Sequence, residues 1–147
     1  MPSNKTKEEE NLNCFYIKIP TSARFVPVLL ALVESYADQS QFTRDDIHNI
    51  RLSVDEAIAN IIKHAYKHDS GFITGELSFA GNMLRISLIH QGTPFDLSRY
   101  SEPDIKRYIK ERKKGGFGIY LMKNLMDNIL YTSKNGVHKI ILIKEKK

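Results

Sequence analysis

The sequence predicts an α/β fold: a two-layer sandwich whose mixed, mostly antiparallel sheet is covered by helices on one face. Two pairs of apolar, alternating segments are each joined by a short turn, which is typical of antiparallel hairpins. Three other segments carry apolar residues at three- and four-residue spacing, which is typical of helices with one buried face. These elements follow the order strand, helix, helix, hairpin, helix, hairpin.

The first half of the chain supplies one strand and two helices. Residues 13–19 alternate as a half-buried strand does. Thr21 or Ser22 can cap a helix that runs to about residue 38, and Pro27 is compatible with it only if the helix begins close to that residue. The apolar stripe expected to be buried in this helix comprises Phe25, Val28, Leu29, Leu32, Val33 and Tyr36.

The second predicted helix begins after Thr43 and ends near Tyr66. The Thr43 hydroxyl can accept a hydrogen bond from an exposed N–H group, and Asp45 and Asp46 suit the positive end of a helix dipole. Its expected core stripe consists of Ile47, Ile50, Val54, Ile58, Ile61 and Ala65.

The second half of the chain contains both predicted hairpins. Strands at 72–79 and 83–90 flank a turn at 80–82, and strands at 128–133 and 138–144 flank a turn at 134–136 that contains Asn-Gly. Residues 98–114 are polar, and residues 117–127 carry a helical stripe.

Size and composition indicate a single domain over residues 13–147, preceded by a disordered polar tail at residues 1–12. The chain has no apolar run long enough to span a bilayer and no secretory signal, so we expect no membrane partner. Its one cysteine, Cys14, precludes an internal disulfide and fits a reducing cytoplasm.

Most of the net charge of +5 lies in residues 99–114, just before a glycine-rich turn. Such a run suits the phosphates of a small ligand at least as well as a nucleic-acid backbone. No aromatic-interleaved strand or helix-turn-helix pattern accompanies the basic run, so we expect no nucleic-acid partner.

Glu56 and Asn60 stand four residues apart on the second predicted helix, and therefore project from nearly the same face. This face lies beside the apolar stripe and also carries Lys63 and His64. Taken alone, a Glu/Asn pair is more often part of a solvated helix face than part of a site.

Gly115, Gly116 and Gly118 surround Phe117 and open the third predicted helix. Glycines at a helix N-terminus let backbone N–H groups approach a phosphate, and the helix dipole favours negative charge there. The run alone is weak evidence, because turns and close packing also produce such glycines. It matches neither a Walker loop nor a dinucleotide-binding fingerprint.

In this order, the motifs resemble those of the histidine-kinase-like ATPase superfamily, which has the Bergerat fold. Glu56-x-x-x-Asn60 resembles its asparagine box, residues 91–96 the end of its first glycine box, and residues 116–121 its second glycine box. The residues after these motifs, namely 64–66, 94–96 and 125–127, are similar to those of bacterial anti-sigma factor serine/threonine kinases.

The resemblance implies an ATP- and Mg²⁺-dependent kinase site. Asn60 would bind Mg²⁺ through its carboxamide oxygen, and Glu56 would accept the proton of the attacking serine. Lys63 would approach the phosphates from the same helix. The backbone at the second glycine box would hold the phosphates and Gly92 would lie beside the adenine. The other residues expected in the nucleotide site are His90, Phe95, Gly115, Gly116, Phe117 and Gly118.

His90 departs from the family pattern, in which an aspartate at this position accepts a hydrogen bond from the adenine amino group. A neutral imidazole offers one acceptor nitrogen, and its protonated form offers none. His90 is therefore either a nucleotide contact or a histidine packed at the end of a strand.

Two functions remain open under this resemblance. The first is an anti-sigma factor that binds a sigma factor and phosphorylates an antagonist protein, with a homodimer formed through the first strand and helix as a further possibility. The second is a non-catalytic partner-binding protein with a degenerate nucleotide site. A histidine-kinase ATPase domain from a longer protein fits less well, because residues 21–38 contain no histidine.

Overall fold

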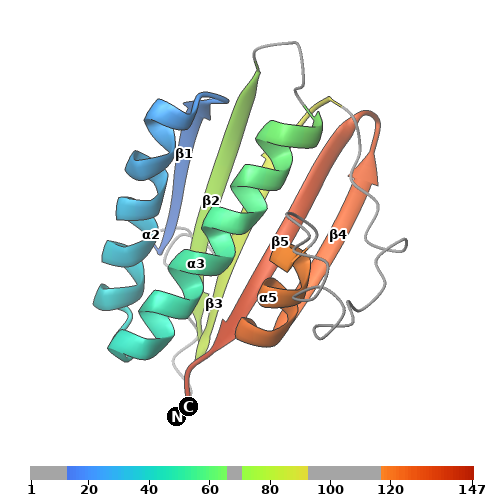
Figure 1. Ribbon diagram of the computed structural model, residues 1–147. Coiled ribbons are helices and arrows are strands. Elements are labelled where there is room, and N and C mark those ends of the chain that lie inside the picture. The colour runs from blue at the N-terminus through green and yellow to red at the C-terminus, as the bar shows by residue number, and fades with distance from the viewer. Residues whose placement is uncertain (1–12, 66–70, 93–116) are drawn as a thin grey trace, which may run out of the picture.

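The computed structural model describes residues 13–65, 71–92 and 117–147. Within these ranges one five-stranded sheet is covered on one face by helices (Figure 1), which confirms the predicted two-layer sandwich. The expected tail at residues 1–12, residue 66 and the polar segment 98–114 lie outside the described residues. No helix among the described residues is both long and apolar enough to cross a bilayer.

The five strands follow the spatial order β1-β2-β3-β5-β4, and all four pairings are antiparallel. Both predicted hairpins are present. Because β5 pairs with both β3 and β4, it is an inner strand. The strands are β1 (Cys14–Pro20), β2 (Phe72–Ala80), β3 (Met83–His90), β4 (Asn128–Lys134) and β5 (Val137–Glu145).

The first helical segment begins with a short 3-10 turn, η1 (Ala23–Phe25), and continues as α2 (Val26–Gln39). The Ser22 side chain caps the 3-10 turn, and Pro27 lies in the first turn of α2, where a missing N–H group costs nothing. The prediction that a helix tolerates Pro27 only near its start is thus confirmed.

The second helical segment, α3 (Arg44–Asn60), begins as predicted. Thr43 Oγ1 accepts a hydrogen bond from the backbone N–H of Asp46 at 3.2 Å. After Asn60 the chain continues through one π-helical turn, η2 (Ile61–Ala65). The third helix, α5 (Phe117–Leu125), ends two residues before the predicted boundary.

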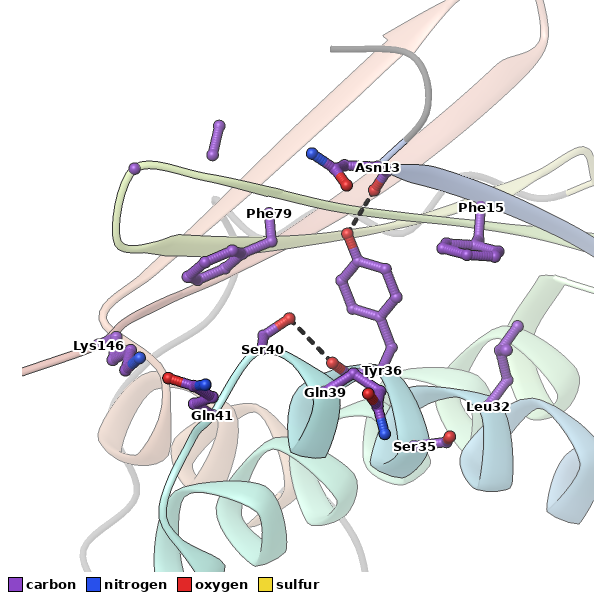
Figure 2. A pocket seen from close by; sticks show the side chains of 12 residues that line it. Asn13, Phe15, Leu32, Ser35, Tyr36, Gln39, Ser40, Gln41, Phe79 and Lys146 are labelled. Atoms are coloured by element: carbon purple, nitrogen blue, oxygen red, sulfur yellow. Dashed lines mark hydrogen bonds between the residues drawn. The ribbon is translucent and has the colours of Figure 1, made fainter. Parts of the chain in front are cut away.

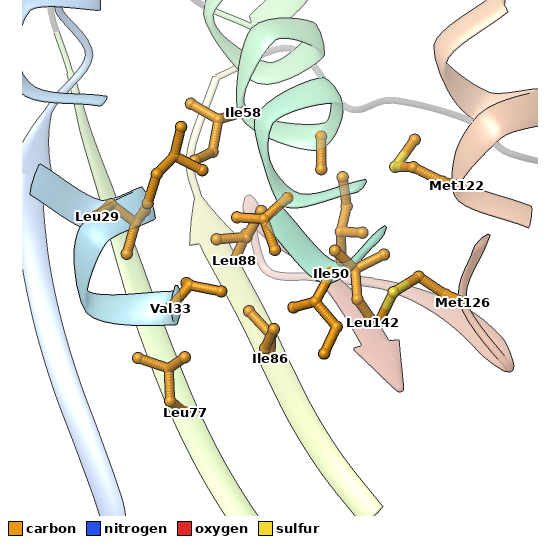
Figure 3. Packing of buried hydrophobic residues seen from close by; sticks show 14 of the residues in the cluster. Leu29, Val33, Ile50, Ile58, Leu77, Ile86, Leu88, Met122, Met126 and Leu142 are labelled. Carbon is orange, nitrogen blue, oxygen red and sulfur yellow. The ribbon is translucent and has the colours of Figure 1, made fainter. Parts of the chain in front are cut away.

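One hydrophobic core fills the space between the helices and the sheet (Figure 3). The sheet contributes residues of alternate positions, such as Leu77, Ile86, Leu88 and Leu142, all of which are fully buried. The helices contribute Leu29, Val33, Ile50, Ile58 and Met122, and Met126 adds to the core directly after α5.

The prediction that Phe25 and Val28 are buried in the core is wrong, because they are 39% and 52% exposed. A 3-10 turn advances three residues per turn, so Phe25 is out of phase with the α-helix that follows. The buried stripe of α2 instead follows Leu29, Leu30, Val33 and Ala37, which leaves Val28 on the outer side.

Candidate functional site

Glu56 and Gly118 lie side by side, although 61 positions separate them in the chain. A Cβ atom placed on Gly118 would be 2.5 Å from Oε2 of Glu56 and 3.4 Å from its Cδ. The carboxylate of α3 therefore fills the space that a side chain at the start of α5 would need. The structure thus joins two motifs that the sequence only places in order.

Asn60 is the last residue of α3, one helical turn beyond Glu56, and is half-buried. Its carboxamide oxygen is a hard ligand of the kind that Mg²⁺ accepts, and the Glu56 carboxylate lies one turn away on the same helix. Among the described residues no group of three His, Cys, Asp or Glu could hold a metal by itself. This donor set supplies too few ligands for a closed metal site and fits a cation that also takes phosphate oxygens as ligands.

Lys63 lies in the π-helical turn and is exposed. It lines a groove of about 480 Å³ between α3 and α2, together with Asp55, Ala59 and Pro27. Glu56, by contrast, meets Gly118 of α5. A π-turn has wider hydrogen-bond spacing than an α-turn and changes the phase of the residues beyond it. The structure therefore places Lys63 toward α2 and Glu56 toward α5.

His90 is buried, with 2% of its surface exposed, at the end of β3. Its Nδ1 is 3.0 Å from the backbone carbonyl of Gln91. Because a carbonyl can only accept, Nδ1 carries the hydrogen and donates it. Burial lowers the pKa of His90 below its ordinary value, the hydrogen bond to Gln91 opposes this, and the neighbouring His138 lowers it further.

His138 is a buried polar residue near this end of the sheet that the sequence interpretation did not single out. It pairs with His90 across β3 and β5, and the two ring centroids are 5.3 Å apart. Its Nε2 is 2.9 Å from the carbonyl oxygen of Gly92, and its Nδ1 is 2.8 Å from Oγ of Ser133. The signal available in the sequence was alternation: His138, Ile140 and Leu142 occupy the same face of one strand.

Gly92 has a φ of +97°, a backbone conformation that side-chain-bearing residues rarely adopt. It lies two residues beyond the end of β3. Of the other expected site residues, Phe95, Gly115 and Gly116 lie outside the described residues, and Phe117 begins α5.

A separate cavity of about 500 Å³ lies near the β2–β3 hairpin and the C-terminal end of α2 (Figure 2). Tyr36 stands at its centre, packs edge-to-face with Phe15 and donates a hydrogen bond to the backbone carbonyl of Asn13. Gly81, in the hairpin, also lines this cavity. Neither Glu56 nor Gly118 lines this cavity, and His90 lies at the opposite end of β3, so the cavity is distinct from the Glu56 region.

Residues 19–144 match the family of histidine kinase-like ATPase domains. Serine-protein kinase RsbW of Bacillus cereus (strain AH820) is 31% identical over 125 residues, which cover 82% of this chain and 78% of the relative. The same kinase of Bacillus thuringiensis (strain Al Hakam) is 33% identical over the same shares.

A crystal structure of the RsbU and RsbW domains of a Mycobacterium tuberculosis protein superimposes with a TM-score of 0.66 at 17% identity. The match covers 90% of this chain and 32% of that structure. Because the identity is only 17%, the likeness shows the fold alone. On the family match and the identity to the RsbW kinases, the chain belongs to the histidine kinase-like ATPase family, in its branch of anti-sigma factor serine kinases.

Proposed function

We propose that this protein is an anti-sigma factor that uses ATP and Mg²⁺ to phosphorylate a serine or threonine of an antagonist protein. The observation that carries the proposal is the contact of the Glu56 carboxylate with Gly118. It brings an acid–base group to the N-terminal end of α5, where backbone N–H groups and the helix dipole favour phosphate.

Glu56 is the proposed general base. As the serine oxygen of the antagonist attacks the γ-phosphorus of ATP, Glu56 takes the hydroxyl proton and the bond from phosphorus to the ADP oxygen breaks. Asn60 would hold Mg²⁺, which, when bound, offsets the charge of the phosphate oxygens. His90 and Gly92 would lie at the adenine, and the backbone around Gly118 at the phosphates.

The regulatory consequence follows from charge. Phosphorylation adds about −1.5 to −2 charges to the antagonist, and a surface that fitted the neutral hydroxyl would bind it less well. The kinase is then available to hold a sigma factor. A homodimer through β1 and α2 stays a prediction, which the molecular mass in solution tests.

The second candidate function is partner binding without catalysis. His90 favours it, because this buried imidazole stands at the position where the family pattern has an aspartate that binds the adenine. Both candidates share the fold, and they differ in whether nucleotide is bound and its phosphate transferred.

The test is phosphotransfer from ATP to the cognate antagonist, which must first be sought, for instance among neighbouring genes, alongside calorimetry with ATP and Mg²⁺. We expect Glu56→Gln to keep nucleotide binding and to abolish transfer, because the amide keeps the shape but cannot take a proton. Glu76→Gln, the same change in β2 on the sheet face away from the helices, serves as the control and should transfer normally. Equal transfer by Glu56→Gln and wild type would remove Glu56 as the base, and no ATP binding by wild type would favour the non-catalytic candidate.

A further inference from the structure

Hydrogen bonds fasten the C-terminal end of α5 to β5. Lys144 Nζ donates to the carbonyl oxygen of Leu125, the last residue of α5, at 2.8 Å. Just beyond the helix, the N–H of Asp127 donates to the carbonyl of Ile143 at 2.9 Å, and the Asp127 carboxylate accepts from the N–H of Glu145 at 2.6 Å. Of these bonds, the one from Lys144 ends on the helix itself.

Lys144 also faces α3. Its Nζ is 3.9 Å from Oδ1 of Asp46, in the first turn of α3, and the Lys144 side chain is only 12% exposed. Lys144 follows Ile140 and Leu142 at alternate positions of β5, so its side chain leaves the sheet on the face that the helices cover. A single shielded cation therefore joins the C-terminal end of α5 and the N-terminal end of α3 to the same strand.

The charge and the donor of Lys144 both suit this place. The last carbonyl groups of a helix lack partners within the helix, and the helix dipole makes this end negative, so an ammonium group stabilises it. A hydrogen bond from a charged donor also contributes more than a neutral one. Such a bond matters for α5, because helices as short as its nine residues depend mainly on tertiary packing.

The other end of α5 carries Gly118, which meets the Glu56 carboxylate of α3. At about 1.5 Å per residue, Leu125 lies about 10 Å along the helix from Gly118, so Lys144 acts on this contact through the helix. We propose that Lys144 is a positioning residue: by holding the end of α5 beside Asp46 of α3, it seats α5 so that Gly118 stays against the Glu56 carboxylate. The consequence for phosphotransfer rests on the proposed function, whereas the seating of α5 does not.

Hydrogen exchange tests the seating of α5 without nucleotide. Lys144→Met keeps a side chain of similar length and removes its charge and its donor. We expect the amides of α5 to exchange about tenfold or more faster in this variant, the change that corresponds to one lost charged hydrogen bond, while those of β3 change much less. The control is Lys139→Met, the same change on the opposite face of β5, which should exchange as wild type does. Unchanged protection of α5 in a folded Lys144→Met variant overturns the inference, whether or not the protein transfers phosphate.

Phosphotransfer distinguishes a positioning role from a purely structural one. With saturating ATP and antagonist, we expect folded Lys144→Met to transfer at least about tenfold more slowly than wild type, as small misplacements at reacting groups do. Lys144→Arg keeps the charge and the donors and should restore most of the rate, and Lys139→Met should transfer normally. Faster exchange in α5 of Lys144→Met together with a normal rate overturns the positioning role and leaves the proposed function intact.

A double variant identifies the route by which Lys144 acts. Gly118→Ala already displaces the Glu56 carboxylate, so adding Lys144→Met should slow transfer by less than about twofold further. Two independent losses of about tenfold would instead multiply to about a hundredfold, and that result overturns the inference. If wild type transfers no phosphate, the proposed function fails, and hydrogen exchange alone then decides whether Lys144 seats α5.

Discussion

Oε2 of Glu56 occupies the space that a side chain at Gly118 would fill, because a Cβ atom there would come within 2.5 Å of it. A separation this short is one that real Cβ atoms essentially never show, so a substitution at 118 must displace the carboxylate or α5. The carboxylate is the end of a flexible side chain, and its displacement costs far less than moving a packed helix.

Gly118→Ala should therefore impair activity without unfolding the protein. The new methyl group pushes the Glu56 carboxylate from its position, and we expect phosphotransfer to fall at least about tenfold, as small misplacements at reacting groups do. Stability should stay level or rise by up to about 1 kcal/mol, since alanine favours a helix over glycine. Phosphotransfer assays and urea unfolding measure both. Normal transfer by a folded variant would contradict the role given to this contact.

Asn60→Ala should remove the Mg²⁺-dependent part of ATP binding. The residue is half-buried at the end of α3, and its loss leaves the core side chains unchanged. We expect affinity in Mg²⁺ to fall at least about tenfold, since even outer partners of metal ligands contribute that much. Calorimetry with Mg²⁺ and with a chelator gives the comparison. A variant whose affinity still rises with Mg²⁺ as in wild type excludes Asn60 as a ligand.

His90→Asp should tighten ATP binding. A carboxylate accepts a charge-assisted hydrogen bond from the adenine amino group, which is stronger than one to a neutral ring nitrogen. The expected gain is about fivefold to 150-fold, the range for one improved buried hydrogen bond. The measurement needs no partner protein. Weaker or equal binding by the folded variant would show that the imidazole already serves fully or lies away from the adenine.

Folding stability should decline as the pH falls below 6.5, the ordinary pKa of histidine. Burial lowers the pKa of folded His90, so between that pKa and 6.5 the unfolded chain binds more protons than the native one. The stabilisation is complete above 6.5 and is lost toward the lower, folded pKa. Urea unfolding at several pH values should show a weaker decline in His90→Gln than in wild type. Parallel curves would refute the contribution of His90.

Thr43→Ala should lower stability by about 0.5–2 kcal/mol, because the N–H of Asp46 loses the hydroxyl that caps α3. The cap lies at the far end of the helix from Glu56 and Asn60, so ATP affinity should not change. Urea unfolding and calorimetry measure the two quantities. A fall in affinity with retained folding would indicate that the two ends of α3 are coupled.

Element boundaries followed closely from the sequence where local chemistry decides them. Thr43, Pro27 and the Asn135-Gly136 turn each mark an end through their own backbone or side chain. The phase of α2 did not follow, because the 3-10 turn before it is not encoded in apolar spacing. The π-turn after Asn60 was missed for the same reason, and it changes where Lys63 points.

The candidate site was only partly predictable. Glu56, Asn60 and Gly118 were found from spacing and resemblance, but their proximity depends on how α3 packs against α5. His138 carries no local motif. Its contact with Gly92 arises from the pairing of β5 with β3, which the order of elements along the chain does not specify.

The inner position of β5 has a consequence for how the protein is made. Residues 137–145, which form β5, leave the ribosome after every other described strand. Until then the strand that lies between β3 and β4 is missing, so β3 has no partner on that side and β4 has none. Nascent chains that end before this strand should expose an open edge and an apolar face, both of which invite aggregation. We therefore expect synthesis, rather than the finished molecule, to be the stage at which this protein depends most on chaperones.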